Sequence, residues 1–427
     1  MNITFHGAAR EVGRSCVTIK SQDAKVMLDA GIKFDKQQET EYPANITDLN
    51  SYDAAFLSHA HLDHSGALPL FDHKGLNCPI FTTDVTKLTT HELLEDSFKI
   101  GRLKHQHLGY SELDITKCLS VMRKIKVKDK EDHYNKIGFD FFDAGHIPGS
   151  ASILIETEGK KSLYTGDINT QDTNLLKGAK TWEEISDVDV MITEATYGDR
   201  THANREQTQK EFDEAIKQTL NNNGKVAIGV FAVGRAQEIL LELDKLNLDC
   251  PIYLDGMAKR IIELYLSRPG CVKDFDALKR AYNNVTIVKG HRHRKNILNE
   301  QGIFVSTSGM LSGGPILSYL TTIADDPNSR MILTGYQGRN TNGRLLLEKG
   351  YVKDRNKDVK INCEISHFDF SAHAGKEQLQ ELIKKINPQQ LLINHGDPAA
   401  IDSLAEWANS ENIKTTIPEL GETINIE

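Results

Sequence analysis

The chain has 427 residues, of which 39% are hydrophobic and 26% are charged, and its formal net charge is −9 at pH 7. Such a composition is typical of a soluble globular protein with a large core in two or three domains. No run approaches the ~18 apolar residues of a membrane-spanning helix, so no membrane association is expected. The negative charge argues mildly against a general nucleic-acid coat protein. It is compatible with a nuclease, because affinity for phosphates depends on local basic patches and bound cations.

The N-terminal residues and the cysteines predict a cytoplasmic protein. The N-terminal residues lack the basic segment followed by an apolar segment that marks a secretory signal. The six cysteines are scattered without a CxxC pair. This spacing argues against a disulfide framework and against a thiolate zinc site. We therefore expect reduced and mostly buried thiols.

The first strands of the chain lead to a candidate carboxylate. Short strands are predicted at 2–5 and 16–20, and a third at 25–28 ends at Asp29, which precedes Ala and Gly. An Asp in such a position commonly starts a turn, and this is the simpler interpretation of Asp29 alone. The alternative is a buried carboxylate that orients a metal ligand. It gains weight because the next strand with ligand-type residues follows about thirty residues later.

The segment LSHAHLDHSGAL, residues 57–68, follows a buried strand and opens a segment with helical character. Within six positions it holds four groups able to bind a metal: His59, His61, Asp63 and His64. Alternate residues at a strand end project the same way only while the chain stays extended. The first two histidines can therefore share one ion, and the Asp-His pair can face a second after the chain turns. A His-rich surface loop is the alternative, but three of only 16 histidines beside an Asp favour metal binding.

Later strands also end in ligand-type residues. His146 lies in the loop GHIPGS between strands predicted at 138–142 and 152–156. A lone histidine in a Gly/Pro turn is usually only a turn residue, but this loop lies at the mouth of the expected sheet. Three further residues directly follow, or closely follow, predicted strands: Asp167, Glu194 and His395. The sequence does not separate a general acid–base role of Glu194 from that of a more distant carboxylate.

From about residue 200 to 370, helical patterns alternate with apolar strands, which is typical of an α/β domain with a mainly parallel sheet. The expected helices are 205–221, 235–246 and 258–266, and the expected strands are 225–230, 251–254, 302–306 and 330–334. Arg235 opens a helix after a Gly, where a phosphate can bind. Ser308 lies in a turn of small residues that lets a ligand approach the backbone. An ordinary flexible turn explains each of them as well.

Two further HxH patterns lack the Asp-His continuation. His105 and His107 belong to a segment that we interpret as solvated and weakly basic. The run KGHRHRK, residues 289–295, is the most basic stretch of the chain. We interpret it first as a charged surface and second as an RNA contact.

Sorted by chemistry, the candidates form a site for two metal ions. Zinc takes imidazole and carboxylate ligands and keeps a position open for water in catalytic sites. One ion would be held by His59, His61 and His146, and the other by Asp63, His64 and His395, with Asp167 bridging them. Two ions ~3.5–4 Å apart can activate water and neutralise charge on a phosphoryl oxygen. Manganese or iron also suits such ligands, so zinc is the preferred metal.

These residues resemble the motifs of the metallo-β-lactamase superfamily. The HxHxDH segment 59–64, together with Asp29, His146 and Asp167, is similar to the first four motifs of that superfamily, in order. The β-CASP nucleases have three additional motifs, which resemble Glu194, His373 and His395, and the stretches 231–238 and 306–311 are also similar to that group. The loops around His146 and His373 look closer to cleavage and polyadenylation factor endonucleases and their prokaryotic relatives than to ribonuclease J.

The resemblance implies an α/β fold. An αββα metallo-β-lactamase sandwich would be formed by residues 1–199 and 371–427, with a β-CASP domain inserted at 200–370 and the active site in the cleft between them. The chain starts at the first strand of the catalytic domain, without the KH domains of some archaeal members or the C-terminal domain of ribonuclease J. A homo-oligomer and sequence-selective RNA docking are therefore left open.

The resemblance also implies a zinc-dependent ribonuclease that acts on single-stranded RNA, with an endonuclease favoured. His373, paired with Glu194, would protonate the leaving oxygen or position the scissile phosphate. Asp63 would belong to the catalytic group as well as to the metal ligands, and Asp29 would act from behind the ligands. Arg235 and Ser308 would contact substrate phosphates.

Three alternatives share these residues. A 5′-to-3′ exoribonuclease would use the same metals and a pocket for the 5′ phosphate. A thioester or lactam hydrolase would need no long cleft, so the large insert and the pair of His373 and Glu194 argue against it. A non-catalytic RNA-binding protein of a processing complex would be expected to have lost metal ligands, whereas this chain has all seven.

Overall fold

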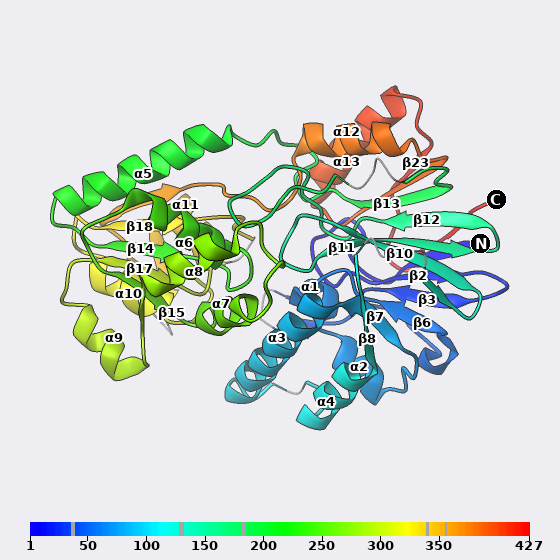
Figure 1. Cartoon of the computed structure of the whole chain (residues 1–427), viewed down its shortest axis with the longest axis horizontal. Helices are drawn as coiled ribbons and strands as arrows, with labels where there is room; N and C mark the ends of the chain where they lie inside the picture. Colours follow the sequence, from blue (N-terminus) through cyan, green and yellow to red (C-terminus); the bar gives the residue numbers. More distant parts are fainter. Residues whose placement is uncertain (36–38, 107, 128–131, 181–184, 339–340, 355–356) are drawn as a thin grey trace. The chain divides into compact units, whose positions relative to one another are not determined.

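The computed structural model describes residues 1–35, 39–106, 108–127, 132–180, 185–338, 341–354 and 357–427. The chain divides into two compact units (Figure 1). Unit 1 comprises Met1–Asp172, Leu176–Thr201 and His373–Glu427, and unit 2 comprises Thr173–Leu175 and His202–Ala372. The position of one unit relative to the other is not determined, and each is described by itself. The domain boundaries 1–199, 200–370 and 371–427 stay a prediction.

The first sheet of unit 1 joins the two ends of the chain. Its strands lie in the order β24 (Thr423–Asn425), β1 (Asn2–Phe5), β2 (Val17–Lys20), β3 (Lys25–Leu28), β6 (Ala54–Phe56), β7 (Ile80–Thr83) and β8 (Met122–Ile125). The pairs from β24 to β3 are antiparallel, and those from β3 to β8 are parallel. The parallel strands β6 and β7 are buried along their whole length, as expected for strands covered on both faces.

The second sheet of unit 1 has the order β23 (Thr415–Thr416), β22 (Gln390–Asn394), β13 (Val190–Glu194), β12 (Lys160–Tyr164), β11 (Ala151–Thr157), β10 (Ile137–Asp143) and β9 (Asp132–Tyr134). From β12 to β23 the pairs are parallel, and from β9 to β12 they are antiparallel. Four parallel strands, from residues 160–194 and 390–416, therefore end at the same edge of this sheet.

The two sheets of unit 1 face each other across one apolar core. Side chains of both sheets meet there, among them Phe5, Val17, Phe56, Phe139, Phe141, Ile153 and Ile192. The outer face of the first sheet packs against α2 (Leu68–His73) and α4 (Glu112–Val121), next to α1 (Leu62–Ser65) and α3 (Asp84–Leu103). The outer face of the second sheet packs against α12 (Lys376–Ile386) and α13 (Pro398–Ser410) (Figure 1). Unit 1 is thus the αββα sandwich that was predicted.

The sequence of α12 explains how such a helix docks. Its buried residues recur at the spacing of one helical face: Leu379, Leu382, Ile383 and Ile386. Burying each of these side chains contributes about 1.5–3 kcal/mol, which is more than the propensity of a short helix supplies. Lysines occupy the last turn at the opposite face, where they favour the helix C-terminus.

Unit 2 contains one six-stranded sheet in which every pair is parallel. The order is β16 (Thr286–Ile287), β15 (Ile252–Asp255), β17 (Ile303–Ser306), β14 (Val226–Gly229), β18 (Arg330–Leu333) and β21 (Glu364–His367). Its helices are α5 (Arg205–Asn221), α6 (Arg235–Leu246), α7 (Ala258–Leu266), α8 (Phe275–Asn283), α9 (His291–Ile297), α10 (Ile316–Ile323) and α11 (Asn342–Lys349). The α/β class predicted for this part of the chain is confirmed.

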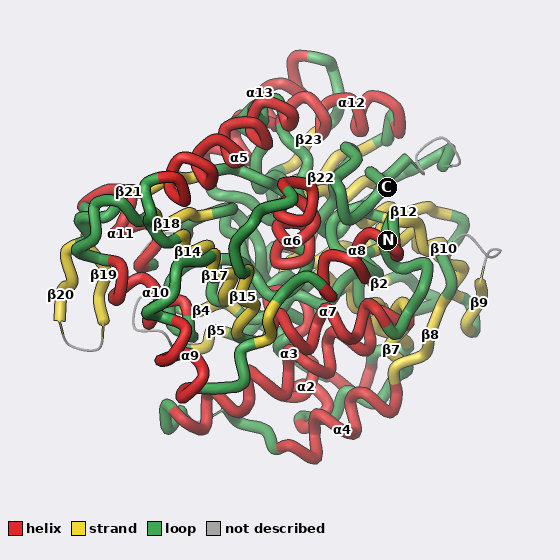
Figure 2. The backbone as a smooth tube through the Cα atoms, turned by 60° about the vertical axis from the view of Figure 1, so that its left-hand side comes forward, coloured by secondary structure: helices red, strands yellow, loops and turns green. Residues whose placement is uncertain are grey.

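Smaller elements complete the description. A hairpin of β19 (Tyr351–Asp354) and β20 (Lys357–Lys360) follows α11 in unit 2 (Figure 2). Unit 1 adds the hairpin of β4 (Lys33–Phe34) and β5 (Thr40–Glu41) and the 3-10 helix η1 (Leu49–Ser51). Among the described residues, no helix combines the length and the apolar character needed to span a membrane.

The predicted helices 205–221, 235–246 and 258–266 are confirmed at those bounds. Helix α3 begins at Asp84, where the Thr83 side chain caps it by accepting from the Thr86 N–H. The basic run 289–295 was predicted as a surface and forms most of the short helix α9. All six cysteines lie in the described residues as free thiols, four of them buried, as expected.

Candidate metal centre

The parallel strands of unit 1 bring ligand-type residues together at their carboxyl ends. In the second sheet, β12, β13 and β22 are neighbours, and Asp167, Glu194 and His395 lie at or just beyond their ends. In the first sheet, β3 and β6 are neighbours, and Asp29 and His59 follow them. Carboxyl ends of adjacent parallel strands open at one edge, where ligand sites of α/β proteins are usually found.

One group of side chains consists of His59, His61, His146 and Asp167, whose ligand atoms all lie within 4.8 Å of one another. The Nδ1 of His61 lies 3.1 Å from the Nε2 of His146. The Oδ2 of Asp167 lies 3.4 Å from the Nε2 of His59 and 3.6 Å from the Nε2 of His146. Three imidazoles and a carboxylate oxygen thus surround one small space.

A second group consists of Asp63, His64 and His395. The Nε2 of His395 lies 3.4 Å from the Oδ2 of Asp63. The other oxygen of Asp167, Oδ1, lies 3.3 Å from the Nε2 of His64 and 3.3 Å from the Nδ1 of His395. Asp167 therefore turns Oδ2 toward the first group and Oδ1 toward the second, which is the arrangement of a carboxylate able to bridge two cations.

The donor set fits divalent metal ions. Three buried atoms of the cluster have no hydrogen-bond partner among the described residues: His59 Nε2, Asp167 Oδ1 and His395 Nε2. Leaving a buried polar atom unsatisfied costs about 1–3 kcal/mol. A cation with imidazole and carboxylate ligands would satisfy all three at once, and this ligand chemistry is that of zinc or a related metal.

The protonation states of three histidines and of Asp167 are suited to metal binding. Burial lowers the pKa of His59, lowers the pKa of His146 well below its usual range, and lowers the pKa of His61 to about 3. These imidazoles are therefore neutral, which is the form that binds a metal. Burial raises the pKa of Asp167, but the neighbouring histidines, His395 first, outweigh it and hold that pKa well below the usual range. The carboxylate is therefore ionised.

Asp29 is hydrogen-bonded to one of the candidate ligands, His64. Its side chain is buried, and its Oδ2 accepts from His64 Nδ1 at 2.7 Å, from Ser58 Oγ at 2.7 Å and from Tyr164 Oη at 2.8 Å. The Nδ1 proton of His64 is thus held by Asp29, and its Nε2 is left to face the cluster. The backbone of Asp29 has φ 56°, a left-handed value that a residue with a side chain adopts at a cost. Asp29 therefore does more than start a turn.

Sequence reasoning missed Ser58 and Tyr164. Besides the bond from its hydroxyl, Ser58 donates its backbone N–H to Asp29 Oδ1 at 2.7 Å. Tyr164 is the last residue of β12 and reaches Asp29 from the facing sheet. The only sequence signal was position, since Ser58 directly precedes the HxHxDH segment and Tyr164 lies three residues before Asp167.

His373 and Glu194 form a pair next to the cluster. The Nδ1 of His373 lies 3.0 Å from both carboxylate oxygens of Glu194. Glu194 is buried and also accepts from the backbone N–H of Ile168 at 2.7 Å. The ring centroids of His373 and His146 are 4.5 Å apart. Burial lowers the pKa of His373, but the charges of Glu194 and Asp167 outweigh it and raise that pKa to about 9.

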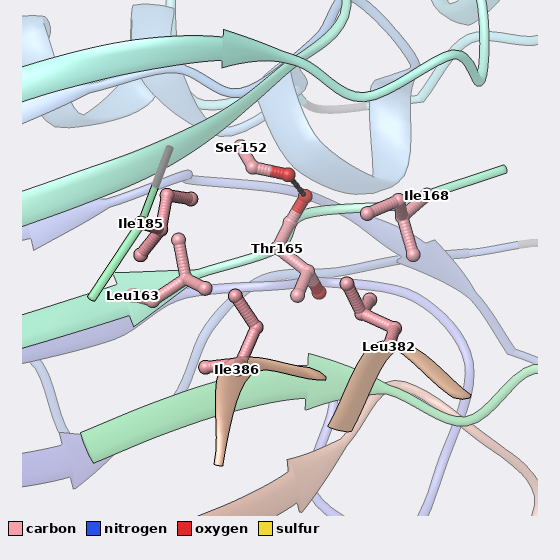
Figure 3. A pocket seen from close by; sticks show the side chains of 7 residues that line it. All are labelled: Ser152, Leu163, Thr165, Ile168, Ile185, Leu382 and Ile386. Carbon is pink, nitrogen blue, oxygen red and sulfur yellow. Dashed lines mark hydrogen bonds between the residues drawn. The ribbon is translucent and has the colours of Figure 1, made fainter. Parts of the chain in front are cut away.

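The cluster is open on one side. His59, His64, His146, Asp167 and His395 are buried, whereas Asp63 and His373 retain 32% and 20% side-chain exposure. Asp63 and the His373 ring are therefore partly accessible to solvent. A separate pocket in unit 1 is not this centre (Figure 3). It lies between the second sheet and α12 and is mainly apolar, lined by Ser152, Leu163, Thr165, Ile168, Ile185, Leu382 and Ile386.

Arg235 and Ser308 belong to unit 2 and are not grouped with the metal cluster. Arg235 opens α6 directly after Gly234, which has φ 75°. Ser308 follows β17, and its Oγ accepts from the backbone N–H of Ser312 at 3.1 Å. Both lie beyond the carboxyl ends of central strands of the unit-2 sheet. His105 is exposed, and His107 lies outside the described residues.

Three protein families match the chain. Residues 18–196 match the metallo-beta-lactamase superfamily domain, and residues 236–346 match the Beta-Casp domain. Residues 358–418 match the Zn-dependent metallo-hydrolase RNA specificity domain. Together the first and third matches include all seven residues of the two groups in unit 1, and the second match lies within unit 2.

Curated relatives match this chain over all or nearly all of its length. The chain is 42% identical to the probable RNase MJ4 of Methanocaldococcus jannaschii, over 100% of both chains. It is 34% identical to RNase aCSPSF2 of Saccharolobus solfataricus, over 98% of this chain and 84% of the relative. It is 31% identical to cleavage and polyadenylation specificity factor subunit 3 of Dictyostelium discoideum, over 100% of this chain and 57% of the relative. A solved structure of an Enterococcus faecalis protein of unknown function shares the fold, with a TM-score of 0.60, 15% identity and 99% of each chain covered.

Proposed function

The chain belongs to the β-CASP family of metallo-β-lactamase-fold ribonucleases, and we propose that it cleaves single-stranded RNA internally with two zinc ions. At the level of reaction class it is a metal-dependent hydrolase that acts on RNA. The proposal adds the identity and number of the ions, the residue roles and the internal position of the cut. The observation that carries it is the Asp167 carboxylate, whose two oxygens face two separate groups of ligands.

The ligands follow from the two groups. His59, His61 and His146 would hold one ion, and Asp63, His64 and His395 would hold the other, with Asp167 shared. When bound, two zinc ions would activate water for attack on phosphorus and neutralise charge on the phosphoryl oxygens. The two groups offer both the ligand types and the number of ligands that catalytic zinc takes.

The protein's own acid is His373 in this proposal. Glu194 accepts the Nδ1 proton, so Nε2 carries the proton that can be given to the leaving oxygen. With its pKa raised to about 9, the imidazole is protonated at neutral pH, as an acid must be. Glu194 orients the ring and stabilises its charge. Asp29 holds His64 in the tautomer that presents Nε2 to the cluster.

Unit 2 would contribute to substrate binding. Arg235 offers a guanidinium at the start of a helix, and Ser308 offers a hydroxyl within a loop of small residues. Phosphate groups of RNA are suited to both, because a guanidinium and a helix N-terminus favour anions. We propose them as contacts of the RNA backbone.

The internal cut is supported by the loops around His146 and His373, which resemble those of cleavage and polyadenylation factor endonucleases. The rival proposal is a 5′-to-3′ exonuclease of the same family. RNAs that carry either a 5′ monophosphate or a 5′ hydroxyl and a label at one end separate the two. The proposed endonuclease gives internal fragments at similar rates from both RNAs. Mononucleotides released only from the monophosphorylated RNA would overturn the internal cut.

Metal dependence is tested on the same RNAs. Removing metal with a chelator is expected to abolish cleavage, and adding zinc is expected to restore it, with elemental analysis giving two ions per chain. Manganese is the comparison metal, since it accepts similar ligands. Full restoration by manganese with no bound zinc would overturn the choice of zinc. One ion per chain would overturn the bridging role of Asp167.

A further inference from the structure

The basic helix α9 of unit 2 has no role in the site described above. Residues 277–299 contain six Lys or Arg residues and no Asp or Glu, although the whole chain has 60 acidic residues in 427. The most basic part begins at Lys289, two residues after the end of β16, and continues into α9, which is labelled in Figure 1. Such a segment is unexpected in a chain with net charge −9, so its charge requires an explanation.

Elsewhere in unit 2, many basic side chains pair with acidic ones. Examples are the pairs Arg205–Glu238, Lys245–Glu242, Arg280–Asp244, Arg330–Glu364 and Arg344–Glu348. Lys289, Arg292 and Lys295 have no such partner within the described parts of the chain, and all three are exposed. Their charges are therefore available to an anion from outside.

A buried anchor fixes the orientation of α9. Arg294 donates from Nε to Asp255 Oδ2 at 2.6 Å, and the hydroxyl of Tyr319 donates to the same oxygen at 2.9 Å. Asp255 is the last residue of β15 and is buried. Ile297, one turn after Arg294, is buried in the core of unit 2. Arg294 and Ile297 thus define the inner face of α9.

The outer face of α9 follows from helix geometry. At about 100° per residue, Arg292 lies nearly opposite the face of Arg294 and Ile297, and Lys295 also points away from it. Both side chains are exposed, in agreement with that geometry. The side chains of Arg292 and Lys295 therefore point to solvent, whereas Arg294 fixes the helix to the core of unit 2.

Lys289 and α9 lie at the same edge of the unit-2 sheet as Arg235, which is one of the proposed phosphate contacts. All strands of the unit-2 sheet are parallel, so their carboxyl ends share one edge. Lys289 and α9 follow β16, and Arg235 follows β14, three places along the sheet. With neighbouring strands about 4.8 Å apart, this separation is about 14 Å. A strand of RNA with several phosphates can extend over such a distance.

We propose that Lys289, Arg292 and Lys295 form a binding surface for the phosphates of an RNA strand, which rests on the proposed ribonuclease function. Unpaired cations on a fixed scaffold bind a polyanion by displacing its counterions. A lipid surface is disfavoured, because an interfacial helix also needs exposed apolar side chains. Among the described residues, the large exposed apolar side chains are Phe34, Ile100, Leu103, Leu113, Leu347 and Leu420, none of which is in α9.

The test compares two charge reversals of equal size in the whole protein. The first is Arg292→Glu with Lys295→Glu on α9. The control is Lys210→Glu with Lys217→Glu on α5, where both lysines are exposed and lie among acidic residues. We measure kcat and KM on a long single-stranded RNA at several salt concentrations, and RNA binding directly in the presence of a chelator. Thermal unfolding of each variant shows whether it is folded.

A plot of log affinity against log salt concentration has a negative slope, to which each contact with a single strand contributes about −0.7. Loss of two phosphate contacts therefore makes this slope shallower by about 1.4. The α9 variant is therefore expected to have a KM roughly 10- to 30-fold higher at about 0.1 M salt, with unchanged kcat. The α5 control is expected to stay within twofold of the wild type. If both variants have the same KM and the same salt slope, the proposal that α9 binds RNA is overturned.

Two further outcomes separate this inference from the proposed function. If the wild-type protein binds RNA through α9 but does not cleave it with any metal, the proposed reaction fails and the surface stands. If the wild-type protein does not bind RNA at all, both fail. Should the double Glu variant unfold, Arg292→Gln with Lys295→Gln removes the charges without reversing them. The surface is then overturned if that variant retains the wild-type salt slope.

Discussion

Both units gather polar side chains at the carboxyl ends of parallel strands, but the two edges differ in construction. In unit 1, histidines and carboxylates follow the strands almost directly and face one another within 4.8 Å. In unit 2, glycine-containing loops lead from the strands into helices, and Gly234, Gly256 and Gly314 have positive φ. The first edge concentrates charge in a small buried space. The second edge has Arg235 after β14 and, three strands away, Lys289 and α9 after β16.

The carboxyl ends of parallel strands are thus suited to two different purposes in the two units. A buried cluster of ionisable groups is costly unless a bound cation or a proton satisfies it, so it is suited to hold metals and carry out chemistry. An open edge with cations costs little and is suited to hold a long polyanion. We therefore expect changes in unit 1 to affect metal content and kcat, and changes in unit 2 to affect KM and salt dependence.

The largest effect is expected for Asp63→Ala in unit 1. Losing a ligand removes the charge stabilisation that a cation supplies, so the rate should fall roughly 1,000-fold or more. Elemental analysis should find less bound metal in this variant and full metal in Arg235→Ala of unit 2. Unchanged cleavage by Asp63→Ala would contradict the whole assignment of the cluster.

A smaller effect on rate, without loss of metal, is expected for His373→Ala. A general acid contributes roughly 100- to 10,000-fold, so kcat should fall by an amount in that range. Metal content should match the wild type, because Nδ1 of His373 is held by Glu194. If the variant lost as much metal as Asp63→Ala, His373 would be a ligand and not the acid.

Asp29→Asn is expected to weaken the site by roughly 10- to 100-fold in metal affinity or activity, as is usual when the partner of a ligating histidine is changed. The amide cannot supply the negative charge that holds the Nδ1 proton of His64.

Tyr164→Phe removes one hydrogen bond to Asp29, worth about 1 kcal/mol, and is expected to change activity only a few-fold. Metal titration of both variants compares their losses of metal affinity. A larger loss in Tyr164→Phe than in Asp29→Asn would contradict this prediction.

The smallest effect on kcat is expected in unit 2. Arg235→Ala should raise KM for RNA roughly tenfold with kcat retained, because a hydrogen bond to a charged group contributes about 1.5–3 kcal/mol. Ser308→Ala, which removes a neutral hydroxyl, should raise KM less. Steady-state kinetics on the same RNA measure both. A fall in kcat with unchanged KM would instead indicate that Arg235 acts in the catalytic step. It would contradict the expectation that unit 2 affects KM and unit 1 affects kcat.

The sequence predicted the strand ends of unit 1 well, and the reason is local. Ligand-type residues directly after apolar runs need only the period of the strand to be recognised, so Asp29, Asp167 and His395 could be singled out. Their convergence depends on which strands are neighbours. That information came from the resemblance to a known superfamily, because the pairing of β13 with β22 joins segments about 200 residues apart.

Other features could not be predicted because they depend on tertiary contacts. The hydrogen bond from Tyr164 to Asp29 joins the two sheets, and nothing in either strand specifies it. The anchor of α9 joins Arg294 to Asp255 across 39 positions. The short helix α9 has too few turns for a periodic pattern, so its sequence is equally compatible with a loop.

The place of β22 in the second sheet has a consequence for the newly made chain. This strand lies between β13 and β23, carries His395 just beyond its end, and is made after all of unit 2. Until it is synthesised, unit 1 lacks both a sheet strand and a member of the ligand cluster. A partly translated chain therefore lacks part of the proposed metal centre, and cleavage that depends on this centre is expected only when synthesis is almost finished.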